Sequence, residues 1–129
     1  MATIKSYTDL EQSKKLAEIL PLESADMVFI SYTNLKTNTV EYDYPSVNID
    51  GIEELDIPCW SLAALIEILP NIIVIDGFRW GLSIRKSSIS YLGSMTWDGQ
   101  LTISVKGDNL VDACYEMIIK LNEQNLLVK

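Results

Sequence analysis

The chain has 129 residues, a net charge of −8, and a composition that is 48% hydrophobic and 22% charged. Its length suits one domain with one hydrophobic core, and its ordinary content of glycine and proline excludes long disordered or collagen-like structure. No apolar run approaches the roughly 20 residues that a bilayer span needs, and residues 1–5 lack the apolar core of a signal peptide. We therefore expect a cytoplasmic protein without a membrane span.

The sequence contains no histidine. Histidine is the usual general base of serine and cysteine hydrolases and the commonest metal ligand. The two cysteines, Cys59 and Cys114, each lie beside an aromatic residue and match no metal-binding spacing. We expect two reduced thiols in the core, with a disulfide as the alternative, and no catalytic residue, metal or cofactor.

Acidic residues are concentrated between Thr37 and Phe78. This stretch contains no lysine or arginine, and its carboxylates are Glu41, Asp43, Asp50, Glu53, Glu54, Asp56, Glu67 and Asp76. A field of one sign repels phosphates, so we expect no direct nucleic acid partner. The acidic stretch favours solubility, and it also suits a basic protein partner.

The N-terminal part of the chain predicts a helix, a β-hairpin and a long loop, in that order. Thr8 and Glu11 have the spacing of a capping box, and apolar residues then recur at helical spacing. The segments 27–33 and 39–44 are rich in β-forming residues and flank a polar turn, which predicts the hairpin. An acidic loop follows at about 45–58, and loops of this length are uncommon in one domain and often functional.

The middle of the chain predicts a second helix and a buried strand. Residues 60–69 are apolar almost all round, so we expect this helix to be buried, with a partner surface as the alternative. Pro70 and Asn71 end it. The run 72–75 is continuously apolar, which is typical of a central strand covered on both faces.

The last part of the chain predicts further strands and a third helix. Residues 82–85 and 101–106 alternate between apolar and polar side chains. A three-residue loop at 98–100 puts the apolar side chains of the last hairpin on one face, whereas a two-residue turn does not, so we predict the longer loop. The third helix begins after a cap at Asp108 or Asn109. Its apolar stripe consists of Leu110, Ala113, Cys114, Met117, Ile118 and Leu121.

The predicted order is α-β-β-α-β-β-β-α, with runs of strands between helices rather than strict alternation. This order predicts an α+β fold in which a mostly antiparallel sheet of about five to six strands packs against three helices. We assign residues 1–129 to this one domain.

Two short segments are candidates for chemistry. Cys59 precedes the second helix, and a helix N-terminus can lower the pKa of a thiol. Since no histidine is present to activate it and the adjoining loop is acidic, we expect Cys59 to pack in the core. Arg79, Arg85 and Lys86, near Ser87 and Ser88, are a candidate anion site without the glycines of a phosphate loop. An exposed strand end is the alternative for this basic segment.

The acidic loop and the aromatic residues before it are a candidate partner surface. The loop carboxylates lack the regular spacing of a calcium site, so we expect no specific metal binding there. Aromatic residues near loops are over-represented in interfaces, although two of these also fit a core face of a strand. The surface consists of Asp50, Glu53, Glu54, Asp56, Tyr42 and Tyr44.

Three segments are similar in sequence to a known set of proteins. They are TDLEQSKKLAEILP at 8–21 with ESADM at 23–27, PCWSLAAL at 58–65, and VDACYEMIIKL at 111–121. Together they resemble small proteins encoded in gut Bacteroidales genomes, often in phage-like or mobile regions, that have no assigned activity. The resemblance implies an accessory role of phage origin. It implies no catalytic or binding residue, because the shared segments are mainly the helices.

From these observations we expect a non-enzymatic protein-interaction module of prophage origin. Its partner would be an unidentified protein or a second copy of the chain, bound through the acidic surface or the second helix. The alternative is a small enzyme or ligand-binding domain whose pocket is formed by Arg79, Arg85, Asp76 and Cys59.

Overall fold

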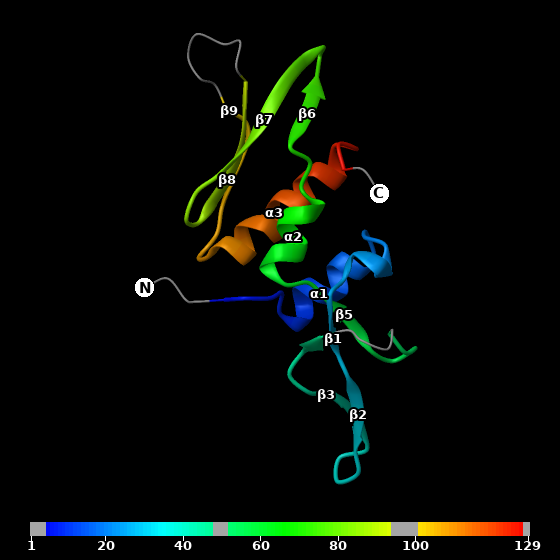
Figure 1. Cartoon of the computed structure of the whole chain (residues 1–129). Helices are drawn as coiled ribbons and strands as arrows, with labels where there is room; N and C mark the ends of the chain where they lie inside the picture. The colour runs from blue at the N-terminus through cyan, green and yellow to red at the C-terminus, as the bar shows by residue number, and fades with distance from the viewer. Residues whose placement is uncertain (1–4, 48–51, 94–100, 128–129) are drawn as a thin grey trace.

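Helices and antiparallel strands make up the chain (Figure 1). The computed structural model describes residues 5–47, 52–93 and 101–127, without the side chains of residues 101 and 102. Within these ranges, the helices are α1 (Leu10–Ala17), the short 3₁₀ helix η1 (Leu22–Ser24), α2 (Leu62–Ile68) and α3 (Leu110–Glu123). The α+β class predicted from the sequence is confirmed.

The strands divide among three sheets, whereas the sequence pattern predicts one sheet. The largest is an antiparallel meander of β6 (Ile72–Ile75), β7 (Phe78–Ile84), β8 (Ser88–Gly93) and β9 (Leu101–Lys106). A second sheet has β1 (Met27–Phe29) between β4 (Ser46–Val47) and β5 (Ile57–Cys59). The third is a hairpin of β2 (Ser31–Asn34) and β3 (Thr39–Tyr42).

Two predicted segments are divided differently in the structure. The predicted strand 27–33 is interrupted at Ile30, so β1 pairs with β4 and β5 while β2 pairs with β3. The predicted loop 45–58 contains β4 and the start of β5, and its residues 48–51 lie outside the described ranges. Strands of two or three residues are too short to show a period in the sequence, because their pairing is fixed by tertiary contacts.

The core lies between the four-stranded sheet and the helices. Figure 1 shows α3 running along this sheet, with α2 beside it and α1 below. The stripe predicted for α3 is confirmed except that Val111 is fully buried and Leu110 only partly. Leu65 of α2 is fully buried and its apolar neighbours are partly buried against the core, so α2 is mainly a core helix. None of the helices in the described ranges is long and apolar enough to cross a membrane.

Strand β6 lies at the edge of its sheet, so the prediction of a central strand is wrong. Ile73 is only 4% exposed, whereas Val74 is 57% exposed on the opposite face. Asp76 and Gly77 have positive φ angles and turn the chain directly into β7, and no other described strand pairs with β6. A short run of four apolar residues cannot show whether one face or both are covered, because it has no polar residue to mark a solvent side.

The start of α1 differs by one residue from the predicted capping box. Asp9 caps the helix: its carboxylate accepts from the Gln12 N–H at 2.8 Å, and the Gln12 side chain accepts from the Asp9 N–H at 3.1 Å. Thr8 is instead fully buried, where its hydroxyl lies 2.8 Å from that of Ser13 and accepts from the Trp60 N–H at 3.2 Å. Thr8 thereby joins α1 to the end of β5. Asn109 caps α3, as predicted, and the predicted loop 98–100 lies outside the described residues.

Candidate functional site

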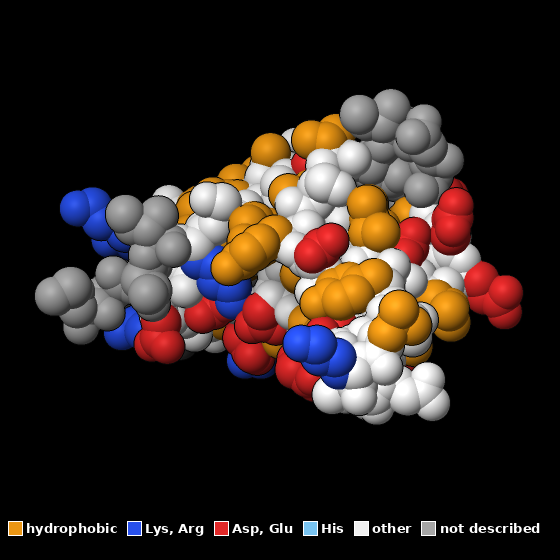
Figure 2. Space-filling view, turned by 90° about the horizontal axis from the view of Figure 1, so that it is seen from below, with side chains coloured by type: hydrophobic (Ala, Val, Ile, Leu, Met, Phe, Trp, Pro, Cys, Tyr) orange, Lys and Arg blue, Asp and Glu red, His pale blue; other side chains and the backbone are white. Residues whose placement is uncertain are grey.

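A hollow with aromatic walls lies between the start of α1 and the β2–β3 hairpin. Its volume is about 520 Å³, and it is lined by Tyr7, Asp9, Leu10, Phe29, Tyr32, Tyr42, Asp43, Tyr44 and Pro45. Figure 2 views this end of the molecule, where hydrophobic side chains lie among acidic and basic ones. We call this site the aromatic hollow.

Three structural elements hold the walls of the aromatic hollow in place. The capping box fixes the first turn of α1, and the last residue of β1, Phe29, is 8% exposed. Pairing of β2 with β3 places Tyr32 opposite Glu41, and the Asp43 N–H extends this pairing by donating to the Ile30 carbonyl at 3.1 Å. The segment after β3 then carries Tyr44, which is 89% exposed.

One cation and several carboxylates lie near these aromatic rings. The Lys14 ammonium lies 5.9 Å from the centroid of the Tyr42 ring, a distance at which a cation is attracted to the ring face. The Tyr32 hydroxyl donates to Glu41 at 2.9 Å, and this hydrogen bond raises the pKa of Tyr32. The carboxylate of Asp43, by contrast, forms no hydrogen bond or ion pair within the described residues.

Asp9, the second carboxylate of the hollow, is already engaged. It accepts from Lys5 at 3.1 Å as well as from the Gln12 N–H. Asp43 is therefore the carboxylate of the hollow that is open to a ligand. Aromatic faces beside an open carboxylate favour a positively charged group, such as a lysine or arginine side chain.

The candidate partner surface predicted from the sequence is divided in the structure. Tyr42 and Tyr44 both line the aromatic hollow. Glu53 and Glu54 are exposed in the segment just before β5. In their sheet, β5 and β4 are the two opposite edge strands. Asp50 lies outside the described residues.

Asp56 has a structural role. It accepts hydrogen bonds from the N–H and the hydroxyl of Ser31, at 2.9 and 3.0 Å, and from the Glu53 N–H at 3.3 Å. The bond from the Ser31 N–H contributes most to holding the pKa of Asp56 below its usual value. Asp56 thus fixes the turn that leads into β5.

Sequence reasoning did not identify Tyr7, Asp9, Phe29 or Lys14 as parts of this site. They precede the acidic stretch, and only the pairing of β2 with β3 and the position of α1 bring them to Tyr42. Their clustering has no signal in local periodicity. The abundance of tyrosine between residues 32 and 44 was the one available indication of an aromatic site.

The thiols are placed as the sequence predicts. Cys59 is fully buried at the end of β5, where its Sγ lies 3.5 Å from the Thr8 carbonyl oxygen, and burial raises its pKa. Cys114 is also fully buried, which raises its pKa to about 12. Both are free thiols. A buried, protonated thiol is a poor nucleophile, and within the described residues no group of three or more potential ligands could hold a metal.

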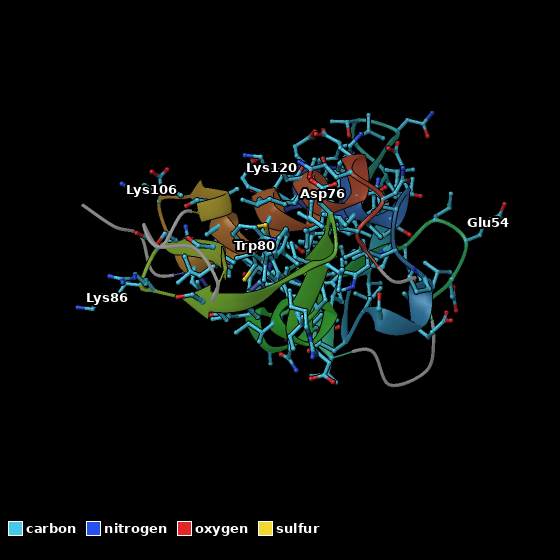
Figure 3. The ribbon with its side chains drawn as sticks, turned by 90° about the horizontal axis from the view of Figure 1, so that it is seen from above. Glu54, Asp76, Trp80, Lys86, Lys106 and Lys120 are labelled. Carbon is cyan, nitrogen blue, oxygen red and sulfur yellow. The ribbon has the colours of Figure 1, made fainter. Side chains whose placement is uncertain are left out.

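The basic residues predicted as an anion site are also divided. Arg79 and Arg85 both lie on β7 or at its end, six residues apart, which is about 20 Å along an extended strand. Lys86 is exposed at the tip of the β7–β8 turn. Figure 3 shows Lys86 and Lys106 at one end of the molecule and Glu54 at the other. Because Cys59 is fully buried, it cannot share a solvent-lined pocket with Arg79 and Arg85.

Comparison of the chain with family models, curated proteins and solved structures finds no match.

Proposed function

We propose that this chain is a non-enzymatic, cytoplasmic protein-interaction module whose aromatic hollow binds a basic segment of a partner protein. The observation that carries the proposal is the combination of aromatic walls with the carboxylate of Asp43, which has no partner among the described residues. Lys14 already lies over one face of Tyr42, so a cation is compatible with this wall. An accessory role of phage origin, which the resemblance implies, is part of this proposal.

The charge of the whole chain supports a basic partner. The net charge is −8, and the segment from Thr37 to Phe78 contains carboxylates without a single lysine or arginine. A field of this sign attracts basic proteins over a distance of about 10 Å at moderate salt and increases their rate of association. The aromatic hollow would then supply short-range recognition of one basic side chain.

The lack of a local core around the hollow also supports a binding role. None of the described residues between 30 and 57 is buried. The exposed apolar side chains in this region are Ile30, Tyr32, Leu35, Val40, Tyr44, Val47 and Leu55. Apolar and aromatic side chains gathered in this way, among polar ones, are typical of an interface.

A peptide of known sequence tests the proposal directly. We would titrate the protein with N-acetyl-tetralysine amide and record amide chemical shifts and the dissociation constant by NMR. We expect saturable shifts at Tyr42 and Tyr44. Substituting Asp43→Asn or Tyr42→Leu should weaken binding by about 3- to 30-fold, which corresponds to about 0.5–2 kcal/mol for a cation–π contact or a charged hydrogen bond.

Glu54→Gln is the matched control, because it removes the same charge from the opposite edge of the neighbouring sheet. Its affinity for the peptide should change by less than a factor of two. If Glu54→Gln weakens binding as much as Asp43→Asn, the binding depends on general charge and the aromatic hollow is not the site. A tetralysine peptide that produces no saturable shift also contradicts the proposal.

A further inference from the structure

The outer face of the four-stranded sheet carries a row of three serines. Ser83 on β7 is paired with Ser90 on β8, and Ser90 is paired with Ser104 on β9. Paired residues of antiparallel strands lie on the same face of a sheet, at strand spacings of about 4.8 Å. The residues next to these serines along each strand turn inward, since Ile89, Tyr91 and Ile103 are core residues. The three hydroxyl side chains therefore lie side by side on the face opposite the core.

A second row lies next to the first, at the β7–β8 turn. Ser88 on β8 is paired with Lys106 on β9. On its other side Ser88 lies opposite Arg85, whose N–H donates to the Ser88 carbonyl at 2.9 Å. One serine is thus placed between an arginine and a lysine, whose Cα atoms are about 10 Å apart at two strand spacings.

The two rows and Leu92 line a hollow of about 220 Å³, which we call the serine hollow. Arg85 and Lys106 are exposed, and neither forms an ion pair with any described residue. Ser90 and Ser104 share a hydrogen bond of 3.0 Å, while the hydroxyls of Ser83 and Ser88 have no protein partner among the described residues. Among the described residues, the hollow therefore has two cationic groups without an ion pair and two hydroxyl donors without a partner.

Carboxylates near Lys106 line a second hollow, which is distinct from the serine hollow. Lys106 also lines a separate hollow with Asp108, Asp112 and Glu116, which belong to α3 and the residues before it. Asp112 forms an ion pair with Lys5, whose Nζ lies 2.7 Å from Asp112 Oδ1. None of these carboxylates lines the serine hollow.

We propose that the serine hollow binds a phosphate group, either free or as the monoester of a small molecule. A phosphate carries a charge of about −1.5 to −2 and accepts several strong hydrogen bonds, and guanidinium, ammonium and hydroxyl groups donate them. This site lies on a different sheet from the aromatic hollow and does not depend on the function proposed above. The site shares Arg85 and Ser88 with the anion site predicted from the sequence. It does not include Arg79 or Lys86, and Lys106 supplies its second positive charge.

Inorganic phosphate and O-phosphoserine are the probes for this site. We would titrate each into the protein, at an ionic strength held constant with sodium chloride, and follow the amide resonances of Ser83, Ser88 and Lys106. We expect saturable shifts at these positions. Arg85→Gln and Lys106→Gln should each weaken binding about tenfold, because each removes one charge-assisted hydrogen bond.

Arg79→Gln is the matched control, since it removes the same charge from the same face of β7, about 20 Å away. It should leave the dissociation constant unchanged. If both probes saturate the site, the proposal is supported and free phosphate is sufficient as a ligand. If only O-phosphoserine saturates it, the proposal is supported and the ligand is a small phosphorylated molecule. Shifts that do not saturate, or that Arg79→Gln and Arg85→Gln reduce equally, overturn it.

Discussion

The two ends of the molecule are stabilised in different ways. In the half formed by β6–β9, α2 and α3, large side chains such as Ile89, Tyr91 and Met117 are fully buried. Around β2 and β3, no described residue between 30 and 57 is buried, and hydrogen bonds such as those from Ser31 to Asp56 maintain the structure. The first half contains most of the buried core, and the second has the exposed side chains that we propose contact a partner. The comparison indicates where substitutions should affect folding and where they should affect binding.

Truncation of a core side chain should produce the largest difference between the two halves. Ile89 is fully buried between β7 and β9, so Ile89→Ala should lower the free energy of unfolding by about 2–5 kcal/mol. Val40 is half exposed on β3, and Val40→Ala should change the free energy of unfolding by less than about 0.5 kcal/mol. Urea denaturation monitored by circular dichroism measures both. Equal losses would show that the β2–β3 region contributes to the core, contrary to this account.

A glycine on β8 gives the next largest expected effect. Gly93 lies opposite Trp80, and a Cβ atom there would overlap the indole ring. Gly93→Ala should therefore destabilise the protein by about 1–3 kcal/mol through displacement of the ring. Gly81→Ala, on the neighbouring strand, is the control, because its Cβ atom would meet no other atom within 4 Å. Comparison of the two denaturation midpoints and of tryptophan fluorescence tests this, and equal midpoints would be the contrary result.

The ion pair between the N-terminal segment and α3 should contribute less, and in a pH-dependent way. Burial lowers the pKa of Lys5, but hydrogen bonds to Asp112 and Asp9 outweigh it and raise this pKa above 10.5. Burial likewise opposes ionisation of Asp112, but hydrogen bonds from Lys5 and Gln12 lower its pKa below 3.8. Lys5→Met should cost about 1–2 kcal/mol at pH 7, as expected for a hydrogen bond between charged groups.

The direction of this pH dependence follows from the two pKa shifts. The stabilisation from Asp112 is complete well above pH 3.8 and is lost as the pH falls through its lowered pKa, and that from Lys5 is lost as the pH rises through its raised pKa. The difference between wild type and Lys5→Met should therefore be constant between about pH 5 and 9 and disappear at low pH. Lys15→Met, which breaks an exposed pair with Glu18 at 3.7 Å, should have almost no effect at any pH. A difference that grows on acidification would contradict the assignment.

The smallest expected effect is local to the β5 turn. Asp56→Asn weakens the acceptor for the N–H groups of Ser31 and Glu53. We expect faster amide hydrogen exchange at these two positions and an unchanged denaturation midpoint, because this region is not part of the core. Glu54→Asn, at an exposed neighbouring position, should leave both amides unchanged. A marked loss of global stability in Asp56→Asn would show that the two halves unfold as one cooperative unit stabilised from this turn.

Hydrophobic periodicity in the sequence predicts the half formed by β6–β9, α2 and α3 better than it predicts the region around β2 and β3. The stripe with Met117 and Ile118 identifies α3, because a helix of fourteen residues repeats its period several times. The edge position of β6 could not be predicted, since four apolar residues fit a central strand equally well. Thr8 fits a helix cap by its residue type, and only the structure shows that its hydroxyl bonds to Ser13 instead.

Both candidate sites were predictable only in part. Tyr42 and Tyr44 are near each other in the sequence, but Tyr7 and Phe29 reach them through the tertiary fold. Likewise Arg85 and Ser88 are neighbours across a turn, whereas Lys106 joins them through the register of β8 with β9. The sequence indicates which residue types are available, and strand register and helix position determine which of them meet.

Hydrogen exchange of the free protein, and of the protein with N-acetyl-tetralysine amide, tests the division between the two halves most directly. We expect strong protection in β8, β9 and α3 of the free protein and weak protection in β2 and β3, because protection follows buried contacts. The peptide should increase protection around Tyr32 and Tyr42 and leave β8 and α3 unchanged. Equal protection of the two halves without peptide, or a peptide effect centred on β6–β9, would contradict this account.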